Sequence, residues 1–508
     1  MTTAAEVKSA DEVSAILEQA YYELATETRL ARVGLKERQE TAPIVERYRY
    51  LYTRPQIAAV RAEMEAATGE RREELARLHG ALLDGYIDTR VAALDDEVVT
   101  SLATATATVD GQTYPFHALV PTITRTDDPG LRERLLEGMV EVIAPRNALM
   151  ARLQGETEAA IAELGYTSYL GFFAANKRVD YPRFAEVIGH LLAATRRLYE
   201  QHVPAWVQDD IGRPLDGLSC AHFYWLRRNQ VPAHLFPAEQ MVETLRRSLQ
   251  GMGIDLDQQP NIHIDAEDRP SKNPRACVIG ARIPGEVHLI IKPTGGKGDY
   301  DAFFHEAGHA EHFATTDPAL PFAFRRLSVS MAQAELFSYL MENLVNDPTW
   351  LQTYLGHTPR QAAFVAYRAA LTDLILLRRY GAKYLYEYAY FSAGGDGPAL
   401  YAEGLRRHTG FAYPAAFWQY DRDPGFYSAD YLRAWFGHAQ VVTALRERYG
   451  PRWWADPQAG DVVRNLWRAG VRPEIEDVVR ELGGTPWDTD TLVHYYEQRL
   501  AYGTSATV

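Results

Sequence analysis

Apolar side chains recur at helical spacing along most of the chain. Ser9 and Glu12 have the spacing of a capping box, and apolar positions from Val13 to Leu24 then follow at intervals of three and four residues. Similar periodicity predicts further helices over residues 42–67, 70–95, 128–164, 237–252, 326–345, 360–390, 397–408, 428–449, 459–468, 473–482 and 488–501. The pattern therefore predicts a mostly α-helical protein.

Short stretches depart from this helical pattern. Residues 98–109 alternate apolar and small polar side chains before an Asp-Gly pair, which predicts a β-hairpin. Residues 261–265 and 276–292 are rich in β-branched side chains and predict a small sheet. Such a strand either packs against its neighbours or offers an edge to an extended peptide. Residues 211–235 show neither periodicity and are expected to be irregular.

The stretch from Asp301 to Thr316 carries the pattern H-E-x-x-H, at His305, Glu306 and His309. Positions i and i+4 lie on one face of a helix, so both imidazoles can bind one ion. Glu306 is then placed to take a proton from a metal-bound water. Two ordinary surface or core histidines are the alternative, but the intervening glutamate is the residue that a zinc hydrolase needs. We expect a zinc site on a helix that Asp299 or Asp301 caps.

A catalytic zinc usually has three protein ligands, so one more is needed. Glu311 and His312 share the predicted helix with the histidine pair, and neither completes a tetrahedral set well. Glu335 lies in a strongly apolar helix further along the chain. An unpaired carboxylate there would cost several kcal/mol, so this side chain requires a cation. We therefore expect Glu335 to be the third ligand.

A salt bridge to Arg325 or Arg326 is the alternative role for Glu335. Glu342 lies two helical turns after Glu335, on roughly the same face. We expect Glu342 to accept a hydrogen bond from one of the ligand histidines, as carboxylates beside metal sites commonly do.

Composition excludes several classes of partner. The 508 residues carry a net charge of −14 and no basic run, so nucleic acid and anionic membranes are not expected as partners. The chain has no window of 18 consecutive apolar residues, so we expect no membrane span. Its first residues include no apolar stretch, so we expect no signal peptide. Cys220 and Cys277 are the only cysteines and have no metal-binding spacing, so we expect a cytoplasmic protein.

Several motifs together resemble a known family. They are HEAGHAEHF, AELFSYLMENL, YSADYLRAWF and ELGGTPWDTDTL. The chain resembles the gluzincin zinc metallopeptidases of the thimet-oligopeptidase and oligoendopeptidase family, and more distantly the angiotensin-converting-enzyme-like peptidases. The resemblance implies a two-lobed, mostly α-helical enzyme with a deep central channel and a small β-sheet beside the metal helix. It also implies zinc bound by Glu335 with the histidine pair, and short peptides as substrates.

The resemblance covers roughly residues 160–500 and suggests a division of the chain. We expect an N-terminal helical region with a short hairpin at 1–160 and a catalytic metallopeptidase region at 161–508.

One part of the pattern departs from the family. Its members bind the substrate oxyanion with a histidine and tyrosines near the YLRAWF-like segment, and the equivalent segment here has no histidine. Tyr427 and Tyr431 are one helical turn apart, and we expect at least one of them to donate to the oxyanion, with Tyr420 and His438 next in order. The alternative is that both are core aromatics whose hydroxyls bond elsewhere.

The sequence therefore predicts a zinc-dependent hydrolase of short peptides. Manganese or cobalt also suits two histidines and a carboxylate. One alternative is the same scaffold recruited to a specialised amide or a biosynthetic step, which the altered tyrosine segment favours. The other is a non-catalytic peptide-binding protein, which has no need of a base such as Glu306.

Overall fold

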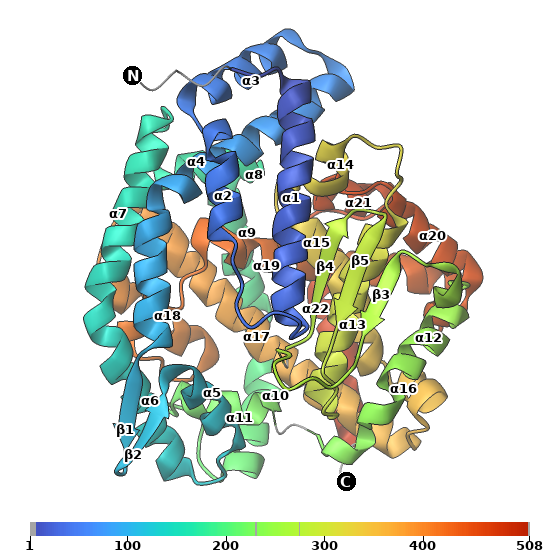
Figure 1. Cartoon of the computed structure of the whole chain (residues 1–508). Helices are drawn as coiled ribbons and strands as arrows, with labels where there is room; N and C mark the ends of the chain where they lie inside the picture. The colour runs from blue at the N-terminus through green and yellow to red at the C-terminus, as the bar shows by residue number, and fades with distance from the viewer. Residues whose placement is uncertain (1–6, 229–230, 274, 506–508) are drawn as a thin grey trace. The chain divides into compact units, whose positions relative to one another are not determined.

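The computed structural model describes residues 7–228, 231–273 and 275–505, and it confirms a mostly α-helical protein (Figure 1). Two compact units are each built from separated stretches of chain. The first unit comprises Met1–Thr89, Pro232–Ala362 and Arg433–Asp488. The second comprises Arg90–Val231, Ala363–Leu432 and Thr489–Val508.

The first unit holds the predicted metal residues. Its helices are α1 (Ala10–Arg32), α2 (Ala42–Tyr48), α3 (Arg54–Ala66), α12 (Met241–Gly251), α13 (Lys297–Thr315), α14 (Phe322–Arg326), α15 (Ala332–Glu342), α16 (Pro348–Leu355), α20 (Pro457–Arg468) and α21 (Ile475–Glu481). It also contains most of α19 (Tyr427–Tyr449) and of α4 (Gly69–Ala103).

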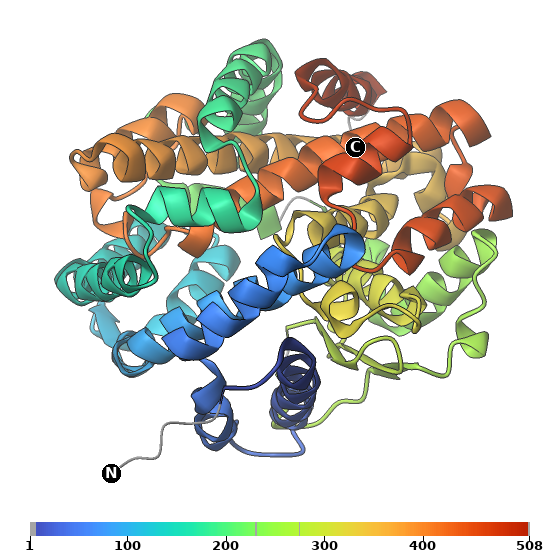
Figure 2. The same ribbon diagram turned by 90° about the horizontal axis from the view of Figure 1, so that it is seen from above.

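A three-stranded sheet lies beside the metal helix, as predicted. Its strands are β3 (Ile262–Asp265), β4 (Cys277–Arg282) and β5 (Glu286–Ile290), in the order β3-β5-β4. β3 pairs with β5 in parallel and β4 pairs with β5 antiparallel, so β4 is an edge strand. α13 packs against β4 and β5 and also against α15 (Figures 1 and 2).

Among the described residues of the second unit, the named elements are helices apart from one hairpin. Its helices are α5 (Phe116–Arg125), α6 (Pro129–Ile143), α7 (Asn147–Glu163), α8 (Tyr169–Lys177), α9 (Tyr181–Ala194), α10 (Arg196–Ile211), α11 (Cys220–Arg228), α17 (Pro359–Ala393), α18 (Gly397–Thr409) and α22 (Thr489–Leu500). The hairpin pairs β1 (Thr106–Val109) with β2 (Gln112–Pro115).

The N-terminal capping box and the hairpin turn are confirmed. The side chains of Ser9 and Glu12 bond reciprocally at the start of α1. Asp110 and Gly111 both have positive φ, as a tight two-residue hairpin turn requires. The hairpin is shorter than predicted, because residues 98–103 continue α4. A brief alternation of small and apolar side chains fits a helix end as well as a strand.

The irregular stretch predicted at 211–235 is wrong in part, because α11 occupies Cys220–Arg228. Its buried face consists of Cys220, Ala221, His222, Phe223 and Leu226. A polar residue within that face obscures the helical periodicity.

The start of the metal helix also differs from the prediction. α13 begins at Lys297, and its N-cap is Gly296 with no side-chain cap. Asp299 instead accepts hydrogen bonds from the backbone N–H and hydroxyl of Thr294, and Asp301 pairs with Lys297. The helix starts before both aspartates because Gly296 adopts a φ of 87°, which reverses the chain there.

The single helix predicted over 326–345 is wrong at its start. α14 ends at Arg326, residues 327–331 form a connection without regular structure, and α15 begins at Ala332. Two serines in this connection favour non-helical backbone, since their hydroxyls compete for backbone hydrogen bonds.

The division into an N-terminal helical region at 1–160 and a catalytic region at 161–508 stays a prediction. The compact units divide the chain at other positions. Both cysteines are free thiols. Among the helices of the described residues, none combines the length and the apolar character needed to span a bilayer.

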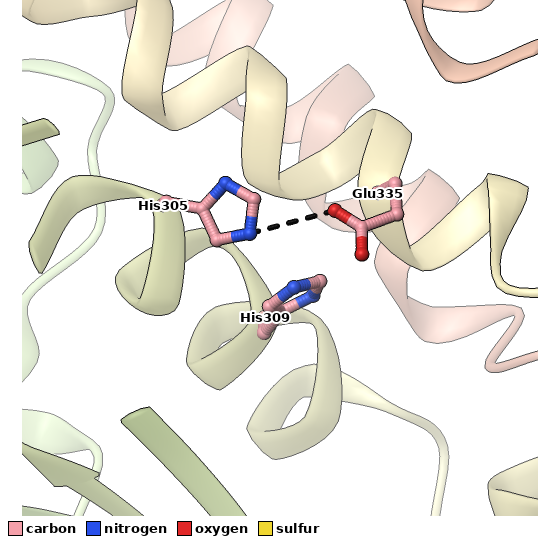
Figure 3. Close-up of side chains that lie close together, drawn as sticks. All are labelled: His305, His309 and Glu335. Carbon is pink, nitrogen blue, oxygen red and sulfur yellow. Dashed lines mark ion pairs between the residues drawn. The ribbon is translucent and has the colours of Figure 1, made fainter. Parts of the chain in front are cut away.

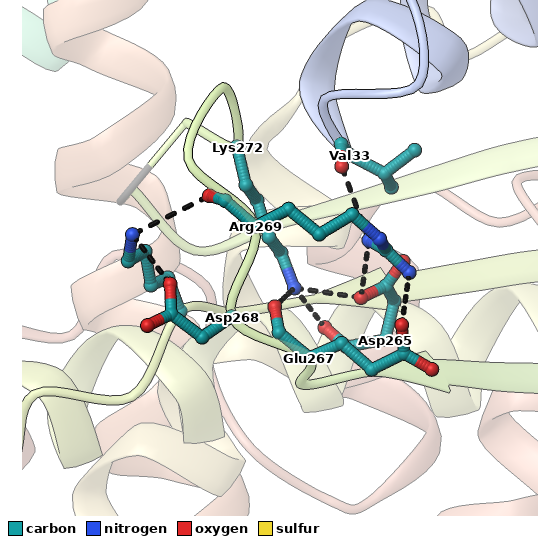
Figure 4. A network of polar contacts seen from close by, with 7 residues as sticks. Val33, Asp265, Glu267, Asp268, Arg269 and Lys272 are labelled. Atoms are coloured by element: carbon teal, nitrogen blue, oxygen red, sulfur yellow. Dashed lines mark hydrogen bonds and ion pairs between the residues drawn. The ribbon is translucent and has the colours of Figure 1, made fainter.

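A polar network closes the end of the sheet where β3 stops (Figure 4). The fully buried ammonium of Lys272 donates to the Asp265 carboxylate (2.7 Å), the Asp265 carbonyl (2.8 Å) and the Glu267 carbonyl (2.9 Å). Arg269 donates to the Asp265 carboxylate (2.8 Å) and to the Val33 carbonyl (3.0 Å). The network therefore ties the end of α1 to the loop that leads into β4.

We expect Lys272→Met to lower the free energy of unfolding, since breaking a buried ion pair costs roughly 3–5 kcal/mol. The loss should lie near the lower value, because Arg269 still pairs with Asp265. Burial alone would raise the pKa of Asp265, but hydrogen bonds from Lys272 and Arg269 outweigh it and lower this pKa. The stability that the carboxylate contributes is therefore present above its ordinary pKa and is lost as pH falls through the lowered value.

Urea unfolding of wild type and Lys272→Met at neutral and acidic pH measures both effects, and the difference should shrink in acid. Lys292→Met is the control, because Lys292 pairs with an exposed Asp268 and should cost about 0–1 kcal/mol. Equal losses in the two variants would contradict the prediction.

Candidate metal centre

Two helices bring the three predicted ligands together. His305 and His309 project from one face of α13, and Glu335 projects from the first turn of α15 (Figure 3). One potential ligand atom from each of the three lies within 4.8 Å of the others. The Nε2 atom of His305 is 3.4 Å from Glu335 Oε2. A single cation between these atoms can contact all three side chains.

A glycine allows the two helices to approach this closely. A Cβ atom at Gly308 would lie 2.4 Å from the Phe337 carbonyl oxygen and 2.7 Å from Ser338 Cα. Such separations are too short for any side chain, so the backbones of α13 and α15 meet at this glycine. Gly308 lies inside the H-E-x-x-H pattern, directly before His309. The same residue therefore brings Glu335 to the histidine pair.

Side chains around the three candidates fix their orientation. Glu342 Oε2 lies 2.8 Å from His305 Nδ1, the position expected for it from the sequence, which leaves Nε2 to face Glu335. Ser338 was not predicted from the sequence. Its hydroxyl contacts Glu335 Oε2 at 3.2 Å and the Glu335 carbonyl at 2.8 Å. The i, i+3 spacing of Glu335 and Ser338 was the signal that could have identified it.

The charges at this site favour a cation. Burial alone would lower the pKa of His305, but its hydrogen bond to Glu342 and the carboxylates of Glu335 and Glu306 raise it to about 9. Burial, with His305 and His312 nearby, holds the pKa of His309 well below its ordinary value. His309 is therefore neutral, the form in which imidazole binds a metal.

Glu306 lies on the same helix, between the two histidines in sequence, and is half-buried. Its Oε2 atom accepts a hydrogen bond from the backbone N–H of Val278 in β4, at 2.9 Å. Burial raises the pKa of Glu306, while His305 and this N–H oppose the rise. No side-chain pattern in the sequence indicated the backbone contact, because it depends on how β4 packs against α13.

The alternative partners named from the sequence are engaged elsewhere. Arg325 pairs with Glu18, and Arg326 donates to the Gly280 carbonyl. Glu311 accepts a hydrogen bond from Gln259, and His312 Nε2 lies 3.1 Å from the carbonyl oxygen of Gly470. These contacts favour Glu335 over Glu311 and His312 as the third ligand, and a cation other than arginine as its partner.

Tyr427 and Tyr431 belong to the second unit, whereas the three candidate ligands belong to the first. Tyr427 begins α19 after a turn at Gly425, whose φ is 64°. The two rings lie on one face of the helix with centroids 4.7 Å apart, and Lys177 Nζ is 5.8 Å from the Tyr427 centroid. Both side chains are partly exposed, and their role as oxyanion donors stays a prediction.

The reserve candidates differ in exposure. Tyr420 is 38% exposed and packs its ring against Phe116 and Phe417. His438 is fully buried in the first unit. A buried imidazole is a poor group for contact with substrate, so Tyr420 is the better of the two.

The donor set suits zinc. Two imidazoles and one carboxylate fit a zinc ion, and the Glu342 carboxylate beside His305 is a support that metal-binding histidines commonly have. No protein-family model matches the chain, and a search of curated proteins finds no match. What the site can bind is therefore inferred from its own side chains.

We expect Glu335→Ala to remove most of the bound zinc, because two histidines alone leave the ion without its carboxylate ligand. Glu311→Ala is the matched control, as a buried acidic residue on α13 that accepts a hydrogen bond from Gln259 instead. Zinc per chain after dialysis against metal-free buffer measures the difference. Equal retention in the two variants would exclude Glu335 as a ligand.

We expect Gly308→Ala to force α13 and α15 apart, because the new methyl group would meet the Phe337 carbonyl. Overpacking of this kind costs about 1–3 kcal/mol, and zinc should be lost with it. Gly298→Ala on the same helix has nothing within 4 Å of its new methyl group and should be neutral or slightly stabilising. Melting temperature and zinc content test both variants, and an unaffected Gly308→Ala protein would contradict the close contact.

Proposed function

We propose that this protein is a zinc-dependent hydrolase of peptide bonds in short oligopeptides. The observation that carries the proposal is the convergence of His305, His309 and Glu335, with Glu306 beside them on the same helix. A metal-storage or structural site has no need of the Glu306 carboxylate beside the ligands, whereas hydrolysis needs a base there. The family resemblance of the motifs supports peptides as the substrate class.

His305, His309 and Glu335 would hold the zinc ion. When bound, zinc would lower the pKa of a coordinated water to about 7 and would polarise a carbonyl group. Glu306 takes a proton from the attacking water and returns it to the leaving amine. The Val278 N–H holds Oε2 of Glu306 and stabilises the ionised base before it accepts that proton.

Glu342 orients His305 through Nδ1. Ser338 holds one oxygen of Glu335, so the carboxylate keeps a fixed direction at the start of α15. Such fixed orientation matters because displacements of about 1 Å at a reacting centre reduce rates roughly 100-fold. We propose that the hydroxyl of at least one of Tyr427 and Tyr431 donates to the developing oxyanion.

β4 is the edge strand that packs against α13, and an extended peptide could in principle add to it. Two of its backbone groups are already engaged, because Val278 N–H donates to Glu306 and the Gly280 carbonyl accepts from Arg326. A substrate would therefore find few backbone partners on this strand. We therefore favour a role for β4 in holding Glu306 over a role in binding a long stretch of peptide.

The two free thiols fit a reducing compartment, and we place the enzyme in the cytoplasm. An altered oxyanion segment without histidine favours, as a second candidate, the same chemistry on a specialised amide substrate.

We expect Glu306→Gln to keep zinc and lose about 10²–10⁴-fold in kcat, because the amide cannot take the proton. Glu286→Gln, a glutamate of β5 that pairs with His288, is the control and should keep full activity. Zinc content and turnover of a mixed library of short peptides test both variants. Near-normal turnover in Glu306→Gln would reject this mechanism.

The wild-type result on the same library separates the candidates. Broad cleavage supports an oligopeptidase. Bound zinc without cleavage of any library peptide would favour the specialised substrate or a binding role.

A further inference from the structure

Glu335 is preceded by a connection that has no regular structure of its own. Residues 327–331 join α14 to α15, and Met331 is the last of them. The Glu335 N–H donates to the Met331 carbonyl at 2.9 Å, so the first turn of α15 starts from this connection. Any displacement of residues 330 and 331 moves the carboxylate of Glu335 relative to the histidines on α13.

A buried arginine from another part of the chain holds this connection. Arg433 of α19 is 2% exposed, and its Nη1 donates to the hydroxyl of Ser330 at 2.9 Å. Its Nε and Nη2 form a two-pronged pair with Glu476 of α21, at 2.8 and 2.7 Å. The indole N–H of Trp487 donates to the same carboxylate at 2.8 Å. The pair with Glu476 therefore fixes the orientation of the guanidinium that donates to Ser330.

The other end of the connection is held in a similar way. Arg77 of α4 is 4% exposed and donates to the Leu327 carbonyl at 3.0 Å. It also pairs with Glu474 at 3.0 Å. Within α15, Gln333 donates to the Gly470 carbonyl at 3.1 Å. Of the two arginine contacts with the connection, the one from Arg433 lies nearer in sequence to the start of α15.

We propose that Arg433, clamped by Glu476, is a positioning residue for the metal ligand Glu335. It acts through Ser330, whose contact sets where α15 begins. The inference rests on the metal centre of the proposed function. It does not depend on which bond the enzyme cleaves, because its readout is zinc affinity and not turnover.

Arg433→Lys keeps the charge but loses the planar fork that reaches Glu476 and Ser330 together. We expect zinc affinity, measured by competition with a chromogenic chelator, to fall about 10–100-fold, as for other residues that orient metal ligands. In a Glu335→Gln background, the same substitution should change zinc affinity by less than about twofold. An effect that passes through Glu335 disappears when the carboxylate is absent.

Ser330→Ala separates positioning from general destabilisation, since it removes the contact with the connection and leaves the Arg433–Glu476 pair in place. It should weaken zinc binding in the same direction with a smaller change in melting temperature. Arg446→Lys is the matched control, because Arg446 is another arginine of α19 paired with a carboxylate, Asp347, outside the connection. It should leave zinc affinity unchanged.

Unchanged zinc affinity in both Arg433→Lys and Ser330→Ala would overturn the inference while leaving the metal centre intact. So would an equal loss of affinity in the wild-type and Glu335→Gln backgrounds, which would indicate a general effect on folding. A wild-type protein that binds no zinc would overturn the inference and the proposed function together. Zinc binding without peptide hydrolysis would leave the inference standing and reject only the proposed activity.

Discussion

The backbone contact between α13 and α15 at Gly308 determines the distance between the histidine pair and Glu335. Helices normally pack with their axes 8–10 Å apart, as their side chains allow. A glycine at the crossing removes the side chain that would otherwise separate them. The H-E-x-x-H pattern therefore has two roles: His305 and His309 are candidate ligands, and Gly308 lets the helix that carries Glu335 approach them.

Charge balance at the centre follows from the same contact. Glu335 and Glu342 come from α15 and Glu306 comes from α13, so three carboxylates act on the His305 imidazole. These carboxylates stabilise a proton on His305, which raises its pKa. They would stabilise a divalent cation more strongly, because it carries twice the charge. His309 is buried and neutral, so it is ready to bind a metal without releasing a proton.

What the sequence could predict was local. The spacing of His305 and His309 follows from helix geometry alone, and a glutamate within an apolar helix indicates a partner cation. The Val278 N–H that holds Glu306 could not be predicted in this way, since a backbone group carries no residue-specific signal. The break in the helix predicted over 326–345 was missed for a related reason. Its serines disfavour a helix only weakly, and the contact of Ser330 with the distant Arg433 cannot be predicted from local sequence.

These long-range contacts set a limit on what a motif can specify. The histidine pair is fixed by hydrogen bonds within one helix, whereas the contact of Arg433 with Ser330 spans 103 residues and that of Arg77 with Leu327 spans 250. Closing such loops costs entropy, and the buried ion pairs with Glu476 and Glu474 must be satisfied when they close. Because both arginines hold the connection before α15, the place of Glu335 depends on the folding of the whole first unit. A peptide containing only α13 would carry both histidines but would lack Glu335 and the helix packing that places it beside them.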